Sequence, residues 1–402
     1  MKISEVPPDP KLRVAMSYGL GADSTAILLR WLHEPDTRPA PWDEIVLVTA
    51  LTGDEWSVTG EQVSAHVLPE LRRAGVRFIQ AARSQRHVRR DGSGIVVLSD
   101  SRHPSRLHLE GSFALSTEML TAGTLPQVGG ARLCSVHAKG DVLDPILDRL
   151  FGDRPYLHVM GFEFNEKSRA DKDSTFNTAT RTGNYPLIRW GFTRDDVLDY
   201  IEGVTQVRWE KSACQFCPFS LTSKAGREAS LTRYAAHPDV AGQVLFMEAV
   251  ALALNPAQSL LGRGRLIDLV TEKMMDGVLE AFRRRMESAE HALYRVRRIY
   301  RAAGGDPLKK SPRADRSVQR IATGSLAQMT AAVRTYRELG ADIDIDVAAG
   351  IERAYVRRRG DRYPTVEEFY VAAPAVVADK QAGNFDAWWE QMTGDEVALQ
   401  LF

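Results

Sequence analysis

The sequence predicts an α/β protein whose first part holds a parallel sheet with helices on both faces. Three short apolar runs, at residues 13–16, 44–50 and 76–80, are predicted as strands. The second run is apolar almost throughout, which is typical of a strand buried on both faces. Helical segments at 26–32 and 57–74 separate the runs. Strands that alternate with helices in this order form parallel sheets.

The second part of the chain is expected to be a separate, mostly α-helical C-terminal domain. We place the two domains at 1–222 and 223–402, and a chain of 402 residues is long enough for both. The second half is rich in Ala, Leu, Arg and Glu, with a loop or hinge expected at 304–312. Its apolar spacing predicts amphipathic helices near 227–252, 265–303, 325–339, 346–359 and 365–380.

Composition limits the classes of protein that this chain can belong to. Apolar residues make up 44%, as in a globular protein, and 52 Lys and Arg balance 52 Asp and Glu. This balance neither favours nor excludes a nucleic-acid partner. The sequence has no apolar run of about eighteen residues and no apolar centre of a secretion signal near Met1. We therefore expect a cytoplasmic protein without a membrane span, and three cysteines are too few for a disulfide framework.

A Gly/Ser turn at residues 17–25, Ser-Tyr-Gly-Leu-Gly-Ala-Asp-Ser-Thr, joins the first predicted strand to the first helix. Glycines let the backbone come close to a ligand, while free N–H groups and the helix dipole favour an anion. The turn is therefore predicted to bind phosphate. The hydroxyls of Ser17, Ser24 and Thr25 add donors, and Asp23 is suited to hold Mg²⁺ or to cap the helix. An ordinary turn capped by Asp23 or Ser24 is the alternative.

Further polar motifs follow the turn, most of them where predicted strands end. They are Thr52-Gly53-Asp54-Glu55, Arg132-x-Cys134-Ser135 with Lys139, Gly161 with Glu166 and Arg169, Tyr185-Pro186-Leu187-Ile188 with Thr193-Arg194, and Ser212-x-Cys214-x-x-Cys217-Pro218-Phe219. In this order the motifs resemble those of the PP-loop ATP pyrophosphatases, in particular the phage and bacterial proteins similar to phosphoadenosine phosphosulfate (PAPS) reductase. The resemblance covers residues 13–219 and fades beyond Cys217.

The resemblance implies a Rossmann-like (HUP-type) sheet that binds ATP and Mg²⁺. The nucleotide-binding residues implied are Ser17, Gly19, Gly21, Asp23, Ser24, Thr25, Thr52, Asp54, Glu55 and Gly161. The catalytic set is Asp23, Ser24, Lys139, Glu166 and Arg169, with Lys139 and Arg169 neutralising phosphates and Glu166 binding Mg²⁺ or orienting the substrate. The alternatives are solvated cations at Lys139 and Arg169, an ion pair between Glu166 and Arg169, and a loop-capping role for Asp54.

The three cysteines, Cys134, Cys214 and Cys217, are the expected metal ligands. Members that reduce PAPS use a cysteine near their C-terminus, and no cysteine follows Cys217, so we reject sulfonucleotide reduction. Three thiolates can hold a 4Fe–4S cluster with one iron open, and several PP-loop enzymes that insert sulfur into nucleic acid bases are built this way. Zn²⁺ held by the same thiols and His137, or three packed thiols without a metal, are the alternatives.

These features lead to three hypotheses about function. The first is an ATP-dependent sulfurtransferase that adenylates a substrate oxygen and replaces it with sulfur from sulfide or another donor, on a nucleic acid or nucleotide-like substrate. The second is a PP-loop amidase or ligase with a structural zinc. The third is a nucleotide- or nucleic-acid-binding module without turnover.

Basic residues concentrate in the second half, between 283 and 320 and between 353 and 362, with Tyr294 and Tyr300 interleaved. Such clusters bind phosphate backbones while tyrosines stack on bases, so RNA or DNA is an expected partner. A solvated helix face is the alternative. A partner protein, or a second copy of the chain in a homodimer, also remains open.

Overall fold

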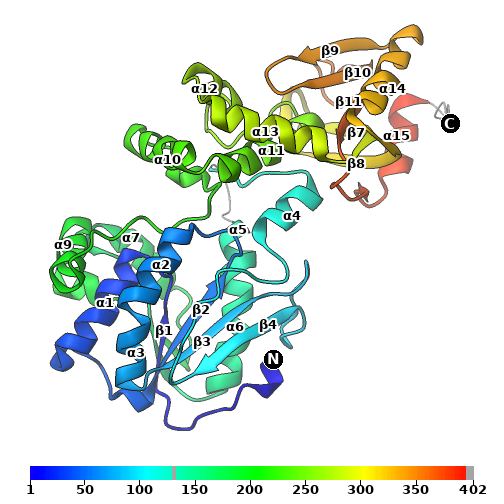
Figure 1. Ribbon diagram of the computed structural model, residues 1–402. Coiled ribbons are helices and arrows are strands. Elements are labelled where there is room, and N and C mark those ends of the chain that lie inside the picture. The colour runs from blue at the N-terminus through cyan, green and yellow to red at the C-terminus, as the bar shows by residue number, and fades with distance from the viewer. Residues whose placement is uncertain (129–132, 395–402) are drawn as a thin grey trace. The chain divides into compact units, whose positions relative to one another are not determined.

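The computed structural model describes residues 1–128 and 133–394, which form two compact units (Figure 1). The first unit comprises Met1–Glu118 with Ala131–Cys217, and the second comprises Met119–Gly130 with Pro218–Phe402. The sequence-based division placed the boundary after residue 222. In the structure the second unit begins after Cys217 and also takes in the segment that follows Glu118.

The first unit contains a six-stranded sheet in the order β4-β3-β2-β1-β5-β6. Every strand pair is parallel except β3 with β4, so the sheet is mixed and mostly parallel. This confirms the α/β class predicted from the sequence and is compatible with a Rossmann-like fold. The strands are β1 (Val14–Ser17), β2 (Ile45–Leu51), β3 (Arg77–Arg83), β4 (Ile95–Ser101), β5 (Tyr156–Val159) and β6 (Arg181–Asn184).

The strand order reverses at β1. The chain passes from β1 through β2 to β3, and then returns to place β5 on the other side of β1. In open α/β sheets a ligand binds beyond the carboxyl ends of the two strands that flank such a reversal. A ligand-binding site is therefore expected at the carboxyl ends of β1 and β5.

Helices cover both faces of this sheet, as the sequence predicts. Val14 and Met16 of β1 lie in a core with α1 (Ala22–His33), whereas Ala15 between them lies in a core with α6 (Asp141–Phe151). This alternation is the period of a strand buried on both faces. The remaining helices of the unit are α2 (Ser57–His66), α3 (Leu68–Ala74), α5 (Leu133–Ser135), α7 (Lys167–Ser174), α8 (Pro186–Trp190) and α9 (Arg194–Thr205), with α4 (Leu115–Ala122) at its boundary.

The second unit is not mostly helical, so this part of the prediction was wrong. It holds an antiparallel sheet in the order β12-β8-β7-β11-β10-β9. The strands are β7 (His291–Ala303), β8 (Asp306–Gly324), β9 (Asp342–Asp346), β10 (Ile351–Arg357), β11 (Thr365–Pro374) and β12 (Lys380–Gln381). The helices are α10 (Lys224–Ala236), α11 (Pro238–Leu254), α12 (Leu266–Glu272), α13 (Asp276–Ser288), α14 (Leu326–Glu338) and α15 (Phe385–Thr393).

The core of the second unit forms where helices pack on this sheet. Met329, Val333 and Tyr336 of α14 pack against Leu293 of β7 and Tyr370 of β11. Helix α11 is buried on nearly all sides, and its apolar sequence has no polar face.

Short 3₁₀ turns lie at Ile3–Glu5, Pro35–Thr37, Trp42–Glu44, Phe164–Glu166 and Pro218–Ser220, and a π-turn lies at Val136–Gly140. Over residues 1–128 and 133–394, no helix has both the length and the apolar character needed to cross a membrane.

Candidate nucleotide and thiol site

The predicted phosphate turn lies at the strand-order reversal. Ser17 ends β1, Gly21 is the N-cap of α1, and no side chain caps this end of the helix. The Ser24 hydroxyl instead donates to the Gly21 carbonyl at 3.2 Å, so the capping alternative is wrong for Ser24. Leu20 has φ +62°, a left-handed conformation that costs energy in a leucine and recurs at functional turns. The helix therefore presents uncapped N–H groups at the carboxyl edge of the sheet.

Gly161, beyond the end of β5, comes directly against this helix end. A Cβ built on Gly161 would lie 2.9 Å from the Ser24 backbone nitrogen and 3.2 Å from the Asp23 Cβ. Neither neighbour can move without disturbing the first turn of α1, so this close approach requires glycine. The two strands that flank the reversal thus bring Gly161 and the turn together, as the sequence analysis expects for a nucleotide site.

Ser17 is held by a buried chain of polar groups that sequence analysis missed. The Ser17 hydroxyl lies 2.8 Å from His158 Nε2 on the neighbouring strand β5, and Arg181 Nε donates to His158 Nδ1 at 3.0 Å. Because Nδ1 accepts, the ring proton sits on Nε2 and is donated to Ser17 Oγ. The Ser17 proton is then free to point toward a phosphate oxygen. Burial, together with the charge of Arg181, lowers the pKa of His158 from 6.5 to about 4, so the ring is neutral.

Arg181 is in turn fixed by acidic and phenolic neighbours. Its Nη2 donates to Asp173 Oδ2 at 2.7 Å, and the Tyr185 hydroxyl donates to the same oxygen at 2.8 Å. Asp173 lies on α7 and Arg181 on β6, so the network joins three segments around the end of β1. Each of these side chains has a partner, which makes the orientation of His158 a fixed property of the site.

Asp23 and Glu166, which the sequence analysis expects to bind Mg²⁺, are each paired with an arginine. Arg194 Nη2 donates to Asp23 Oδ2 at 2.8 Å, and Glu166 forms the ion pair with Arg169, at 2.5 Å, that the sequence allowed as an alternative. Within the described residues, Asp23 Oδ1 and Glu166 Oε2 are buried oxygens without a hydrogen bond, although Arg194 Nη1 lies 2.8 Å from the former. Burial raises the pKa of Asp23 to about 6, and the charge of Glu166 adds to this rise. Mg²⁺ commonly binds one or two carboxylates together with substrate phosphates.

Thr52, Asp54 and Glu55 follow β2 and contact the Cys214–Cys217 segment. Cys214 Sγ lies 3.4 Å from Thr52 Oγ1, and the backbones of Glu55 and Cys214 form an antiparallel bridge. The Gln215 N–H donates to the Asp54 carbonyl at 2.9 Å. The Asp54 carboxylate accepts the Ser116 N–H at 2.8 Å, which is the loop-capping role given as its alternative. Burial raises the pKa values of Asp54 and Glu55.

Lys139 lies within electrostatic range of two of the three cysteines, Cys134 and Cys214. The charge of Lys139, on the π-turn, acts on Cys134, Cys214 and Glu55, and the charge of Cys217 raises the pKa of Cys134 after the larger effect of burial. Burial raises the pKa of Cys214 to about 12, and all three thiols are free of disulfides. Binding of a metal would therefore displace thiol protons.

No group of three or more His, Cys, Asp and Glu side chains arranged to hold a metal ion is found in the described part of the chain. His137, the fourth ligand of the zinc alternative, lies with its Nδ1 3.4 Å from Glu118 Oε1. Arg132, which opens the Cys134 motif, lies outside the described residues. The His137 imidazole is therefore engaged with the Glu118 carboxylate.

One segment links the phosphate turn to the thiols. The Ser212 hydroxyl donates to the Gly19 carbonyl at 3.5 Å, and the indole N–H of buried Trp209 donates to the Leu20 carbonyl at 3.4 Å. Two residues beyond Ser212, Cys214 contacts Thr52. The 209–214 segment thus connects the turn to Cys214 and, through it, to Thr52. Thr25, fully buried with its hydroxyl 3.2 Å from that of Tyr18, supports the turn from the core side.

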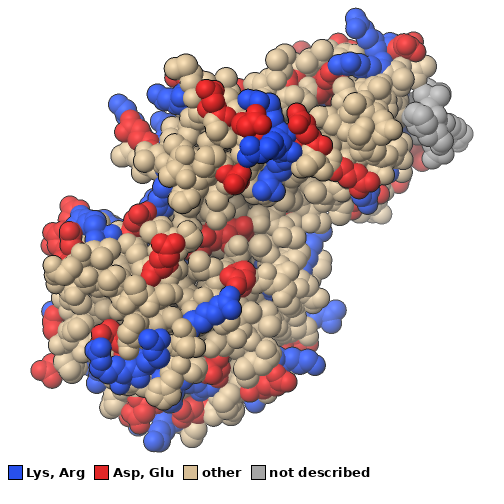
Figure 2. All heavy atoms as spheres, in the orientation of Figure 1, with Lys and Arg blue, Asp and Glu red and all other residues tan. Residues whose placement is uncertain are grey.

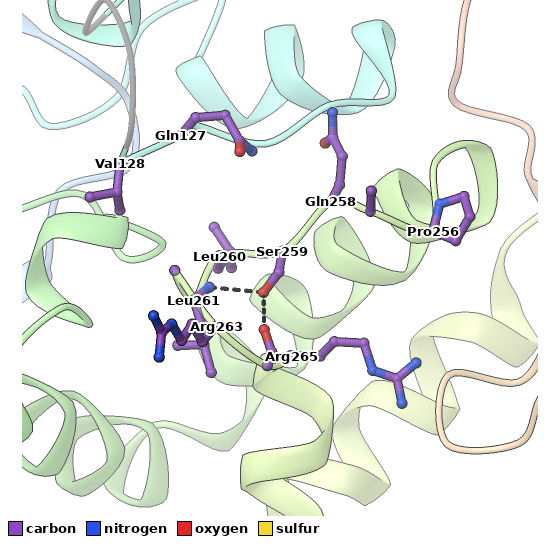
Figure 3. Close-up of a pocket in the computed structure, with 12 residues that line it drawn as sticks. Gln127, Val128, Pro256, Gln258, Ser259, Leu260, Leu261, Arg263 and Arg265 are labelled. Atoms are coloured by element: carbon purple, nitrogen blue, oxygen red, sulfur yellow. Dashed lines mark hydrogen bonds between the residues drawn. The ribbon is translucent and has the colours of Figure 1, made fainter. Parts of the chain in front are cut away.

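The second unit has a hollow of its own (Figure 3). It has a volume of about 410 Å³ and is lined by residues 256–265 with Gln127 and Val128. Ser259 ties this loop together by accepting from the Leu261 N–H at 2.9 Å and donating to the Gly264 carbonyl. Behind the loop, buried Glu248 of α11 accepts the N–H groups of Leu260, Leu266 and Ile267. The sequence analysis did not single out this loop.

Many basic residues of the second half serve the fold. Arg295, Arg298 and Arg353 form ion pairs with Glu368, Glu367 and Asp344, and Arg298 and Arg353 are themselves buried. Tyr294 and Tyr300 are buried as well, so the expectation that they stack on bases was wrong. On the face drawn in Figure 2, basic and acidic residues are interspersed. Only part of the basic cluster is therefore available to a partner.

Comparison of the sequence with protein-family models and with curated proteins gave no match.

Proposed function

We propose that the first unit is a PP-loop ATP pyrophosphatase of the PAPS reductase-like type, with a HUP-type sheet, and that the protein is an ATP-dependent sulfurtransferase. One observation carries the proposal. The uncapped turn at the strand-order reversal is joined by the 209–214 segment to Thr52 and to the thiols of Cys214 and Cys217. An anion cradle beside a group of thiols suits a reaction that activates an oxygen and then delivers sulfur.

The chain's own residues supply the activation. The N–H groups of the turn and the Ser17 and Ser24 hydroxyls bind the phosphates, while Gly161 leaves room for backbone contact with them. Asp23 and Glu166 would hold Mg²⁺ against the phosphate oxygens, and Lys139 and Arg169 add positive charge as negative charge develops. A substrate carbonyl oxygen bonds to the α-phosphorus of ATP, and pyrophosphate leaves.

Sulfur transfer follows at the activated carbon. The sulfur of a hydrosulfide attacks that carbon, and AMP leaves with the original oxygen while the sulfhydryl proton is lost to solvent. Bound by Cys134, Cys214 and Cys217, a 4Fe–4S cluster would offer one open iron as the place where sulfide is held. The zinc alternative loses support because its fourth ligand, His137, lies against Glu118.

Anaerobic purification followed by metal analysis and a pyrophosphate assay tests the proposal. We expect a brown protein with iron and acid-labile sulfide, and pyrophosphate release that depends on ATP, Mg²⁺ and an added nucleic acid or nucleotide-like substrate. Ser24→Ala and Asp23→Ala should lose pyrophosphate release and keep the iron. Cys214→Ser should lose the iron and keep ATP binding. Ser174→Ala, which removes an exposed hydroxyl on α7 of the same unit, is the matched control and should change neither pyrophosphate release nor iron content.

Three results would contradict the proposal, each in a different way. A colourless protein that holds one zinc and forms an amide from a carboxylate and an amine would favour the ligase alternative. Tight ATP binding without turnover on any RNA, DNA or nucleotide offered would favour a binding module. Pyrophosphate release that persists in Ser24→Ala would show that the turn does not take part in the reaction.

A further inference from the structure

The β7–β8 hairpin of the second unit carries more residues on one strand than on the other. Gly304 and Gly305, with φ +59° and +79°, make the turn, and Ala303 pairs with Asp306. The next pairs along the hairpin are Ala302 with Lys310 and Tyr300 with Ala314, so β8 has more residues than β7 between successive pairs. Residues 307–309 and 311–313 are therefore bulges on β8, and such bulges direct side chains outward at sheet edges.

The bulged stretch lies at an edge of the sheet. Strand β8 pairs with β12 only at Ser317 and Val318, and within the described part of the chain no strand pairs with the outer side of residues 306–316. Charged side chains at a sheet edge hinder pairing with another chain. Protection of the edge would need only a few charges on β8 itself. It does not explain why a second basic segment, the loop between β10 and β11, lies beside β8.

This loop joins β10 to β11 and is fixed to the hairpin. The Tyr363 N–H donates to the Pro307 carbonyl at 2.8 Å. Arg359 and Lys310 lie over the same ring, with their charged groups 5.3 and 5.6 Å from the centre of Tyr300. The Tyr300 hydroxyl donates to buried Glu367 at 3.0 Å. Both cations are therefore held on a rigid support, which lowers the entropy lost when they bind a partner.

The hairpin and the loop together form a surface with an excess of positive charge, which we call the basic edge. Its members are exposed and have no carboxylate partner among residues 1–128 and 133–394, and they are Lys310, Arg313, Arg316, Arg359 and Arg362. Two nearby acids are occupied, since Asp306 pairs with Lys309 and Asp315 with Arg301, and exposed Asp361 of the loop offsets one of the five positive charges. Guanidinium groups match the geometry of phosphate, and several of them in a row suit a polyanion.

Within the described part of the chain the basic edge offers no fully exposed aromatic ring on which a base could stack, since Tyr363 of the loop is half-buried. Tyr300 is buried, and the exposed ring of Trp388 is covered by Arg301, 4.5 Å above it. Proteins that bind single strands without sequence preference combine positive charge with such stacking rings. We propose that the basic edge binds the phosphate backbone of duplex nucleic acid, without regard to sequence. This inference is independent of the proposed catalysis, because binding needs neither ATP nor a metal.

Fluorescence anisotropy with the full-length protein tests the inference. A labelled duplex of random sequence, as DNA and as RNA, and the corresponding single strand are titrated at salt concentrations between about 50 and 200 mM, without ATP. Four or five phosphate contacts predict a slope of log K against log salt of roughly −4. We expect the duplex to bind more tightly than the single strand. DNA and RNA duplexes binding with similar affinity would support recognition of the shared backbone.

Charge-reversal variants locate the contact. Lys310→Glu/Arg313→Glu/Arg359→Glu should weaken duplex binding at least about 30-fold and reduce the salt slope by about three. The matched control, Lys224→Glu/Arg283→Glu/Arg337→Glu, makes the same charge change at exposed helical positions and should stay within about threefold of wild type. Because all three edge residues are exposed, the fold should persist. Should the reversal variant fail to fold, the corresponding Gln variant replaces it, with an expected loss of about tenfold.

Each of the remaining outcomes would overturn the inference. These are equal losses in the edge and control variants, a single strand that binds more tightly than the duplex, a salt slope near zero, and displacement of the duplex by polyglutamate of equal charge at equal concentration. The last result would assign the basic edge to an acidic protein partner.

Discussion

Replacing His158 with Gln should remove a part of the protein's stability that depends on pH. The buried imidazole of His158 has a pKa of about 4, against 6.5 in an exposed histidine. Because the pKa in the folded state lies below that of the unfolded chain, unfolding takes up a proton between these two pH values. The contribution of His158 to the free energy of unfolding is therefore fully present above about pH 6.5. It is lost progressively as the pH falls toward 4.

The size of the loss follows from the difference between the two pKa values. A difference of about 2.5 pH units corresponds to about 3 kcal/mol at the acid limit, and to about 1 kcal/mol at pH 5.5. His158 is 7% exposed, so solvent screening reduces this figure little. A Gln side chain can accept from Arg181 and donate to Ser17 as the neutral ring does, and it does not titrate.

Urea unfolding of both proteins between pH 4.5 and 7.5, followed by tryptophan fluorescence, measures this effect. Five of the seven tryptophans, Trp31, Trp42, Trp56, Trp190 and Trp209, lie in the first unit, so the signal reports on the relevant core. The difference in unfolding free energy between wild type and variant should change by about 1 kcal/mol from pH 7.5 to 5.5.

A second substitution checks the electrostatic cause. Arg181→Gln removes a charge that holds the His158 pKa down, so the pH-dependent difference should shrink. Parallel curves for wild type and His158→Gln over the whole range would refute the reasoning. They would mean that the ring is as easily protonated in the folded protein as in the unfolded chain.

Three further predictions follow from close contacts in the two units. Gly161→Ala should weaken ATP binding measured by calorimetry and lower stability by about 1–3 kcal/mol, because its Cβ would meet the Ser24 nitrogen; unchanged affinity would contradict the close approach. Arg298→Met should cost about 3–5 kcal/mol in urea unfolding, because it leaves Glu367 buried without its partner, and adding Glu367→Gln should restore part of the loss. Glu248→Ala should speed protease cleavage within residues 256–265, because Glu248 accepts the Leu260 N–H in this loop and the Leu266 N–H just beyond it. An unchanged cleavage rate would show that the loop is ordered by other contacts.

The first unit was predictable because its signals are local. A nearly continuous apolar run such as 44–50 indicates a strand that is buried on both faces, because side chains on both sides of it are apolar. The structure has β2 at Ile45–Leu51. The strand, turn and helix at residues 14–33 were equally predictable, because the glycines, hydroxyls and following helix are contiguous in the sequence. In both cases the residues that define the feature lie within about ten positions of one another, so no knowledge of tertiary packing was needed.

The strands of the second unit were missed because composition was given more weight than periodicity. Residues 291–303 are rich in Ala and Arg, which favour helices, but they alternate apolar and basic residues through Tyr294, Arg295, Val296 and Arg297. Alternation with β-branched and aromatic side chains is the pattern of a strand. The same holds for 365–374, with its Val, Phe and Tyr residues, which forms β11. Tertiary packing against α14 then overrides the helical preference of the individual residues.

The charge of the second half shows what sequence alone leaves undetermined. A count of arginines treats Arg298 and Arg313 alike, yet Arg298 is buried beside Glu367, 69 residues later in the chain, and Arg313 is exposed on a bulge. Which arginine receives a carboxylate depends on strand register, because an ion pair across a sheet forms between residues that the register places in reach. In the first unit, the register of β1 with β5 likewise places His158 beside Ser17, 141 positions away. Site residues that are brought together by strand pairing therefore have no local sequence pattern, whereas the residues of a loop motif do. The surface that is available to a partner can be identified only after the internal ion pairs have been assigned.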